Sequence, residues 1–515
     1  MKNHSITAVK GIYLCLLTAY AILREIMIIQ NIVGSPLITY GFFGAGMIII
    51  GLEFLRNPRP YFSKGQWLAY LFLFFCVLST VVNLQVDLFS NVKAIAWMVL
   101  YFCLLLPGGW NREGEAKIWE WVMITAVSIL VLLSLVALPM YFFDVGYSYI
   151  RESGFLFYQG FSSVRLRLWG FYVDPNTAGV YNMIAVCFIA YLFHRTQRGW
   201  LRIVLALCCV PLLLLVVLGN SRTVLVAWVI AASWIVFYLC VVALPEKGWK
   251  SVGISVAAMA VAAAVAIGAF SVAKTAMPYL KAAVQRGITE QVKASVHTWY
   301  DRGYRWSGLN VVEGYYGVAP ENQEISIVVP VQPVQNETVP AEQEQPVQDE
   351  AVPAETEQAA ANHNVQTLER TDLGNDISNG RFEIWRDVLI VARHHLLFGA
   401  SPRGISQAAR EVAPGGNVAM YDYAAHNSFL EVLAGTGLTG FAVFMTLLIW
   451  LAVIILRKIF SEGFRWQIAV YGTALLLMVC EMMFISDVFF NLTFGGIAFW
   501  MSAGRILEFG RKEDR

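Results

Sequence analysis

The sequence predicts an all-α integral membrane protein with about 12 transmembrane helices and one large external loop between helices 9 and 10. Hydrophobic residues make up 57% of the 515 residues and charged residues only 14%, whereas a soluble domain carries ~25% charged residues. The mean hydropathy is +0.58, and apolar runs of the roughly 20 residues that span a bilayer recur along the chain. All eight cysteines fall inside such runs, so neither a disulfide framework nor a cysteine zinc site is expected.

The candidate spans are apolar stretches separated by short polar loops. They centre near Leu17, Ala45, Phe74, Val99, Ser128, Ile184, Leu212, Ala232, Ala262, Leu447, Leu475 and Gly495. The first has the character of a signal-peptide core, but no small-residue cleavage site follows it. We therefore expect it to remain as a membrane anchor.

Basic residues alternate between the loops on the two sides. One set of loops and termini contains 19 Lys and Arg residues and the opposite short loops contain 6. The positive-inside rule then predicts a multi-pass protein of the cytoplasmic (inner) membrane, with both termini cytoplasmic and the large loop external. Lys and Arg (37) balance Asp and Glu (36), so a nucleic-acid partner is not expected.

Four parts are expected along the chain: N-terminal transmembrane helices (1–160), central transmembrane helices with outward-facing arginines (161–273), the external loop (274–425) and C-terminal transmembrane helices (426–515). Inside the loop lies a tandem repeat, PVQNETVPAEQEQ followed by PVQDEAVPAETEQ. Its proline and acidic residues, with few large apolar ones, predict a disordered spacer over 320–365.

Residues 378–398 are expected to form an amphipathic helix, with Ser378 and Asn379 as candidate N-cap residues. The apolar residues that recur at helical spacing are Phe382, Trp385, Leu389, Ala392 and Leu396, and this face is suited to lying on the membrane or on other helices. Arg381 would lie in the first turn, where the helix dipole favours an anion. For Arg386 and Arg393, snorkelling toward lipid headgroups is the alternative.

Two more polar sites lie at predicted external ends of spans. Arg222 follows the short turn Gly219-Asn220-Ser221, and an arginine so near membrane depth is costly unless it meets an anion, which could equally be a lipid phosphate. The stretch from Arg165 to Asn176 interrupts the start of the sixth span, and its proline must line protein or water. An ordinary helix cap at Asp174 or Asn176 is the plainer interpretation.

The segment AHNSFLEVLAGTGLTGF (425–441) contains the pattern Ser428-x-x-Glu431, a capping box that predicts a helix start at Ser428. His426 would then lie just outside the positive end of the helix, which disfavours imidazolium and keeps the neutral form that a general base needs. Gly435 and Gly437 allow close backbone approach by a neighbour, although simple helix packing also explains them.

These motifs resemble those of the O-antigen ligase and polymerase superfamily of polyprenyl-diphosphate glycan transferases. The family signature His-[Asn/Ser/Gln]-x9-Gly-x-x-[Gly/Thr/Tyr] is matched by His426-Asn427, Gly437 and Gly440. The external Ser-Arg pair of the family is matched by Ser221-Arg222, and its Gly-Arg-x-x-x-Trp opening by residues 380–385. The resemblance is strongest over about 205–450.

The resemblance implies an inverting glycosyltransferase that moves a glycan from undecaprenyl diphosphate to an acceptor hydroxyl at the outer membrane face. The acceptor would be a growing glycan (polymerase) or a lipid-anchored molecule (ligase). His426 would be the general base, Asn427 would orient it or the acceptor, and Arg222 and Arg381 would hold the diphosphate. Secondary diphosphate contacts or supporting residues would be Arg165, Arg167, Asp174, Asn176 and Trp385.

No cofactor is expected, because the chain contains no Asp-x-Asp string for an external metal site and no Gly-rich loop for a nucleotide. A protein O-oligosaccharyltransferase remains an alternative acceptor specificity. Outside the enzyme class, a lipid-linked glycan flippase or transporter should place charged residues near the bilayer midplane. Glu481 is the clearest such residue, and a buried hydrogen bond explains it more plainly.

Overall fold

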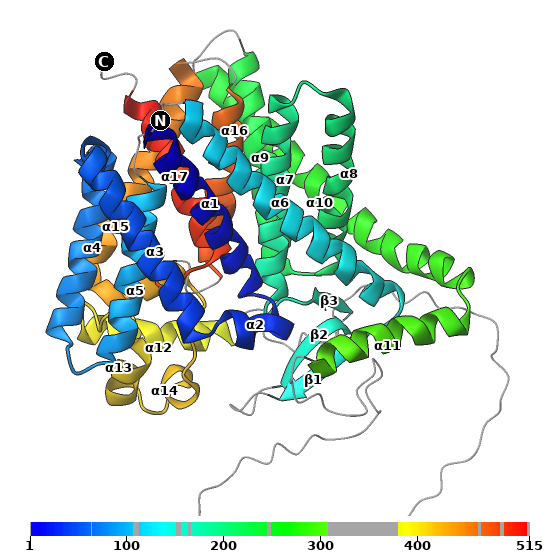
Figure 1. The fold of residues 1–515 in the computed structure, drawn as a ribbon, viewed down its shortest axis with the longest axis horizontal. Coiled ribbons are helices and arrows are strands. Elements are labelled where there is room, and N and C mark those ends of the chain that lie inside the picture. Colours follow the sequence, from blue (N-terminus) through cyan, green and yellow to red (C-terminus); the bar gives the residue numbers. More distant parts are fainter. Residues whose placement is uncertain are drawn as a thin grey trace, which may run out of the picture.

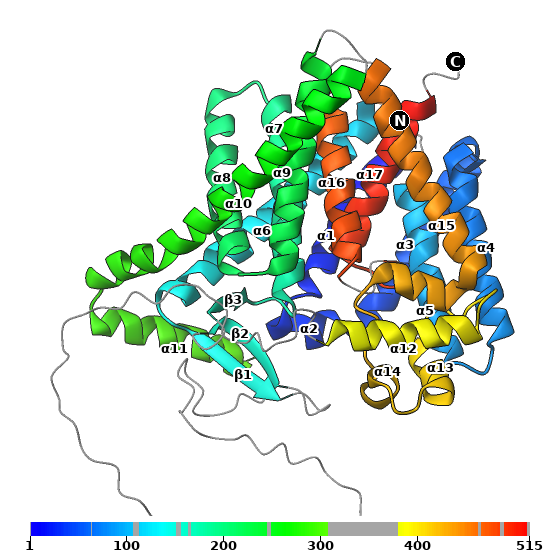
Figure 2. The same ribbon diagram turned by 180° about the vertical axis from the view of Figure 1, so that it is seen from behind.

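The computed structural model describes residues 2–62, 64–106, 113–150, 156–162, 166–244, 249–306, 380–461, 465–484 and 489–511. The acidic repeat lies outside these residues, as do Arg165, Ser378 and Asn379. Long apolar helices stand side by side in a bundle (Figures 1 and 2). They are α1 (Lys2–Leu23), α3 (Pro36–Arg56), α4 (Lys64–Val82), α5 (Leu88–Leu100), α6 (Glu113–Phe142), α7 (Pro175–Arg195), α8 (Gly199–Leu218), α9 (Arg222–Ala243), α10 (Trp249–Arg286), α15 (Ser428–Ser461), α16 (Trp466–Met482) and α17 (Phe494–Arg511).

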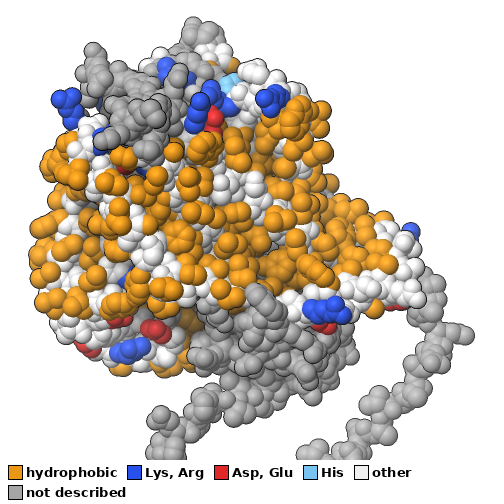
Figure 3. Space-filling model, in the orientation of Figure 1, with side chains coloured by type: hydrophobic (Ala, Val, Ile, Leu, Met, Phe, Trp, Pro, Cys, Tyr) orange, Lys and Arg blue, Asp and Glu red, His pale blue; other side chains and the backbone are white. Residues whose placement is uncertain are grey.

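Every predicted span falls in one of these helices, which confirms the all-α membrane fold. Ten helices of the described residues are long and apolar enough to cross a membrane, and α16 is a shorter apolar helix. Because α17 begins at Phe494, Gly495 lies at the start of the last helix rather than at its centre. Hydrophobic side chains cover the flank of the bundle, and charged side chains gather toward its two ends (Figure 3).

Short elements collect at one end of the bundle, called here the loop end, whereas α1 begins and α17 ends at the opposite end (Figure 1). They are α2 (Met27–Val33), α11 (Glu290–Trp306), α12 (Arg381–His394), α13 (Ile405–Val412), α14 (Asn417–Tyr421), β1 (Gly146–Ile150), β2 (Leu156–Ser162) and β3 (Arg167–Gly170). Two further short turns are η1 (Arg59–Phe62) and the π-helix η2 (Tyr101–Leu105), which follows α5 directly.

A small antiparallel sheet of order β1-β2-β3 lies at the loop end, and the sequence analysis did not anticipate it. Gly146 pairs with Gly160, which in turn pairs with Gly170 across a register shift. A Cβ on Gly146 would lie 2.1 Å from the carbonyl oxygen of Phe161, so the strands can approach this closely only with glycine there. The sheet leads the chain from α6 into the start of α7.

Helix α10 continues to Arg286, past residue 273 where the external loop was expected to begin. Its last turns and α11 are fastened to the end of α6. Gln285 donates to the carbonyl of Phe142 (2.8 Å), and His297 bonds the carbonyl of Phe143 (2.8 Å). The hydroxyl of Tyr300 donates to the carbonyl of Val136 (2.5 Å). The α10–α11 unit is therefore attached to the bundle through main-chain acceptors.

Candidate active site

The predicted polar turn before α7 and the Ser-Arg turn before α9 meet around one buried guanidinium. Arg167 is only 6% exposed. Its Nε donates to the carbonyl of Gly219 (2.7 Å) and its Nη2 to Oδ1 of Asn176 (2.7 Å). The hydroxyl of Ser221 donates to the same Asn176 oxygen (2.5 Å). Because Arg167 donates to Gly219 in one turn and to Asn176 in the other, it holds the turn before α9 and the turn before α7 together.

This network leaves Arg222 at the surface of the loop end. Ser221 Oγ accepts from the backbone N–H of Val224 (3.2 Å) and so caps α9, whose first residue is the exposed Arg222. Asp174 caps α7 by accepting from the N–H of Asn176 (2.9 Å), as the plainer interpretation predicted. The two external sites, which the sequence presents separately, therefore meet in one network, and two helix caps orient their residues.

The turn between α1 and α2 closes over this network. The N–H of Val173 donates to the carbonyl of Glu25 (3.0 Å), and the N–H of Met27 donates to that of Phe171 (2.9 Å). Burial raises the pKa of Tyr172 above its usual value, and the Glu25 carboxylate adds to the shift. Glu25 therefore lies near the start of α7, and the first transmembrane helix helps to fix the position of the site.

Arg381 is the first residue of α12, at the loop end. Gly380 precedes it in the left-handed conformation (φ 77°) and supplies no side-chain cap. The guanidinium of Arg381 lies 5.8 Å from the ring centroid of Phe484, just beyond α16. Helix α12 packs along α15, which in turn contacts α9 and α16, whereas no direct contact between Arg381 and Arg222 is found among the described residues.

The buried face of α12 differs from the apolar stripe expected from the sequence. Ile384, Val388 and Val391 pack into a small core with α13, α14 and α15. Of the predicted stripe, Phe382 (64% exposed), Leu389 (40%) and Leu396 (48%) face outward, as suits a helix lying on a membrane, whereas Ala392 is buried in the small core. The helix spans 381–394 rather than 378–398 because its chain turns at His395.

Asn427, not Ser428, caps α15, which corrects the predicted capping box by one residue. The Asn427 Oδ1 accepts from the N–H groups of Phe429 (3.0 Å) and Leu430 (3.1 Å). The helix begins at Ser428, as predicted. His426 is half-buried and holds φ at 46°, a left-handed conformation that non-glycine residues rarely adopt. The Asn427 cap and this strained turn together fix the backbone at His426.

Replacing Asn427 with alanine is expected to loosen the first turn of α15, because an N-cap oxygen contributes about 1 kcal/mol. Hydrogen exchange of the Phe429 and Leu430 amides should then accelerate about fivefold. Asn427→Asp, which keeps an acceptor oxygen, is the matched control and should exchange at nearly the wild-type rate. Equal exchange in all three proteins would show that this cap does not stabilise the turn.

Helix α15 is interrupted at Gly437, whose backbone is not helical (φ 68°, ψ −174°). The segment 396–400 runs across the break. Leu438 N–H donates to the carbonyl of Leu396 (2.8 Å), and Ala400 N–H donates to that of Ala434 (2.8 Å). The predicted close approach at the signature glycines is therefore made by a loop segment and not by a packed helix.

Small residues are required on both sides of this seam between 396–400 and 434–438. A Cβ on Gly399 would lie 2.4 Å from the carbonyl carbon of Gly435 and from the nitrogen of Thr436. The hydroxyl of Ser79 on α4 donates to the carbonyl of Gly435 (2.8 Å) and accepts from the N–H of Ser401 (3.0 Å). Ser79, on the membrane-spanning helix α4, thus bonds to both segments of the seam.

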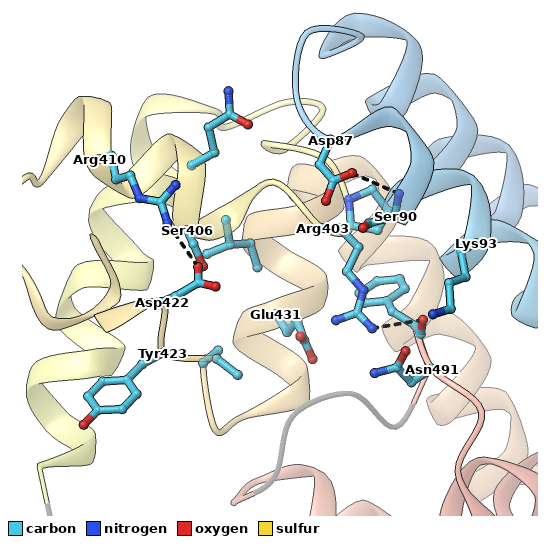
Figure 4. Close-up of a pocket in the computed structure, with 16 residues that line it drawn as sticks. Asp87, Ser90, Lys93, Arg403, Ser406, Arg410, Asp422, Tyr423, Glu431 and Asn491 are labelled. Atoms are coloured by element: carbon cyan, nitrogen blue, oxygen red, sulfur yellow. Dashed lines mark hydrogen bonds and ion pairs between the residues drawn. The ribbon is translucent and has the colours of Figure 1, made fainter. Parts of the chain in front are cut away.

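The sequence did not predict the pocket shown in Figure 4, which is lined in part by Ala424 and Ala425, the two residues before His426. Its volume is about 470 Å³, and its lining includes Lys93 from α5, Arg403 before α13, Ala425 and Glu431. Glu431 is 5% exposed and was interpreted only as a cap residue. The hydroxyl and N–H of Ser90 hold the pKa of Asp87, at the pocket rim, below its usual value.

No group of three or more His, Cys, Asp or Glu side chains in the described ranges is arranged to hold a metal ion. Glu481, the deep ionisable residue considered for a transporter, lies in the last turn of α16 and is 2% exposed. One of its carboxylate oxygens has no hydrogen-bond partner there, so the predicted buried hydrogen bond is not formed by that atom. Its place near a helix end differs from the midplane position that a transporter predicts.

Comparison with known families agrees with the resemblance seen in the sequence. Residues 207–445 match the family model described as O-antigen ligase, and the match covers the helices from α8 into α15. Arg222, Arg381 and His426 all fall within it. Neither a curated protein nor a solved structure matches the chain. The chain is therefore a multi-pass membrane protein, and residues 207–445 of it are similar to the O-antigen ligase family.

Proposed function

We propose that the protein transfers a glycan from undecaprenyl diphosphate to an acceptor hydroxyl at the outer face of the cytoplasmic membrane. The observation that carries the proposal is that Arg222 and Arg381 begin α9 and α12 and His426 lies just before α15, and all three of these helices begin at the loop end of the bundle (Figure 1), within residues 207–445, which match the O-antigen ligase family model. The basic-residue asymmetry of the loops supports an external position for that end.

In the proposed reaction the acceptor oxygen attacks the anomeric carbon of the donor sugar. The bond from that carbon to the phosphate oxygen breaks, and the polyprenyl diphosphate leaves with the electron pair. His426 takes the proton of the acceptor hydroxyl, and one displacement inverts the configuration. Diphosphate is already a good leaving group, so the site needs cations to hold it rather than a strong acid.

Arg222 and Arg381 are the proposed diphosphate ligands, since guanidinium pairs bidentately with phosphate oxygens. Arg167 supports the reaction by bracing the turn that presents Arg222, together with Asn176 and the Asp174 cap. Trp385, one turn after Arg381, has its indole N–H buried without a partner among the described residues. We propose no metal or nucleotide, and therefore no cofactor, in this step.

The test uses full-length protein in proteoliposomes with an undecaprenyl-diphosphate oligosaccharide and a glycan acceptor. Wild type should release undecaprenyl diphosphate and extend the acceptor. A ladder of lengths would identify a polymerase and a single transferred block a ligase. Arg222→Lys and Arg381→Lys keep the charge but lose the bidentate geometry, and each should raise the donor KM about tenfold. Arg386→Lys, exposed on α12, is the control.

Glycan that crosses the bilayer unchanged, with no diphosphate released, would replace this proposal with a flippase. Transfer to a serine or threonine peptide in preference to a glycan would instead identify a protein O-oligosaccharyltransferase. Arginine variants with the donor KM of wild type would remove those residues from the diphosphate site.

A further inference from the structure

The pocket beside His426 has a positively charged wall that nothing in the proposed diphosphate site uses. Lys93 lies on α5 and is half-buried, and Arg403 lies ten residues after Arg393 in the turn that precedes α13. The charged groups that act on Lys93 are the guanidinium groups of Arg24 and Arg403. Within the described ranges no carboxylate forms an ion pair with Lys93, although the carboxylates of Asp87, Asp422 and Glu431 also line the pocket.

The protein holds this wall rigidly. The backbone N–H of Arg403 donates to Oδ1 of Asn91 (2.9 Å), and its Nη2 donates to the carbonyl of Phe490 (3.3 Å). Phe489 anchors the neighbouring segment, since its ring lies 4.9 Å from that of Phe444 and 5.7 Å from that of Trp500. Cations held in place in this way bind an anion with little loss of side-chain conformational entropy.

The opposite wall is suited to a sugar. The guanidinium of Arg410 and the carboxylate of Asp422 face each other at 3.5 Å, whereas the ring of Tyr423 points away from them (Figure 4). Paired polar groups of this kind can exchange hydrogen bonds with sugar hydroxyls. The cavity of about 470 Å³ falls within the ~300–1,000 Å³ range of small-molecule sites.

The position of the pocket indicates which substrate would occupy it. Ala424 and Ala425, which immediately precede His426, line it, as does Glu431 in the first turn of α15. Neither Arg222 nor Arg381 is among the lining residues. The pocket therefore adjoins the segment that carries the proposed base and contains neither proposed diphosphate ligand, as a site for the acceptor requires.

We propose that this pocket, the Lys93 pocket, binds the acceptor glycan through a sugar that carries an anionic substituent, with Lys93 and Arg403 pairing with its oxyanion. Naming the occupant as the acceptor rests on the proposed function. The recognition of an acidic sugar rests on the pocket itself. The chemistry is that of a uronic-acid carboxylate in a bidentate or charge-assisted contact.

The test measures direct binding of simple glycosides to the full-length protein in phosphatidylcholine nanodiscs, by saturation-transfer NMR. Methyl β-D-glucuronide should bind wild type at least tenfold more tightly than methyl β-D-glucoside. Lys93→Gln should abolish this preference, since a hydrogen bond to a charged group accounts for about tenfold or more in affinity. Lys93→Arg should restore it, and Lys293→Gln on the distant α11 should leave it unchanged.

A second variant keeps the test decisive if Lys93→Gln folds poorly. Ser406→Trp fills the pocket from α13 without altering a charge, and it should weaken glucuronide binding at least tenfold while donor KM stays constant. Inorganic diphosphate, added as a competitor, should fail to displace the glucuronide. Displacement by diphosphate at equal concentration would place the donor headgroup in the pocket and overturn the proposal, as would equal binding of the neutral glycoside.

The outcomes also separate this inference from the proposed function. Transfer by wild type with no Lys93-dependent binding would overturn the pocket assignment alone. Lys93-dependent glucuronide binding by a protein that transfers no glycan would uphold the pocket as a glycan site and overturn the transferase proposal.

Discussion

Replacing His426 with asparagine is expected to lower glycan transfer by about 10²–10⁴-fold, the usual effect of losing a general base. Asparagine is the informative substitution because His426 holds φ at 46°, and asparagine tolerates the left-handed region better than alanine does. The variant should therefore keep the turn, the Asn427 cap and the helix start, and lose only the basic nitrogen. Release of undecaprenyl diphosphate in proteoliposomes measures the effect.

The matched control is His394→Asn, because His394 is an exposed histidine in the last turn of α12. It should transfer glycan at the wild-type rate. Donor binding should survive in His426→Asn, so kcat should fall while donor KM changes little. Full activity of His426→Asn at equal protein level would remove the histidine from the chemistry and leave it a role in the turn alone.

Replacing Gly437 with alanine should prevent correct assembly of the loop end. The new Cβ would lie 2.3 Å from the carbonyl oxygen of Leu397 and 2.6 Å from the nitrogen of Phe398, and both are backbone atoms. The backbone of Gly437 (φ 68°, ψ −174°) lies in a region that is essentially restricted to glycine, which adds about 1–3 kcal/mol of strain for a side chain. With overpacking, the total cost should reach about 3 kcal/mol or more.

The yield of monodisperse protein and its thermal midpoint in detergent measure this cost. Gly268→Ala provides the comparison, since a Cβ at that position on α10 meets nothing within 4 Å. Alanine in a helix interior should leave stability unchanged or raise it by about 0.5–1 kcal/mol. A Gly437→Ala protein with the midpoint of wild type would mean that the seam can separate without loss.

Local sequence patterns predicted the features that depend on neighbouring residues. Apolar runs located the spans, and the polar residues before an apolar run located the start of α15 at Ser428. The prediction identified Ser428 instead of Asn427 as the cap because both residue types cap helices and only backbone geometry separates them. The outward stripe of α12 contains the same residue types as a core face, since lipid and protein interior both accept Phe382 and Leu389.

Contacts between distant segments could not be predicted in this way. Lys93 and Arg403 lie on segments about 300 residues apart, and only the packing of α5 against the turn before α13 brings them into one wall. The seam likewise depends on Ser79, whose hydroxyl forms hydrogen bonds with the backbone of Gly435 and of Ser401. No spacing rule connects α4 with residues 401 and 435. A sequence pattern therefore identifies Gly435 and Gly437 but does not show that segment 396–400 passes over them.

The break in α15 at Gly437 also separates the segment next to His426, the proposed base, from the part of the helix that crosses the membrane. Residues after Gly437 form a membrane-crossing helix, and such helices tilt when the lipid thickness changes. The nine residues before it are held by Leu396, Ala400 and Ser79 instead of by a continuous helical rod. His426 therefore has its height set by the loop-end scaffold, and the protein should work alike in thin and thick membranes.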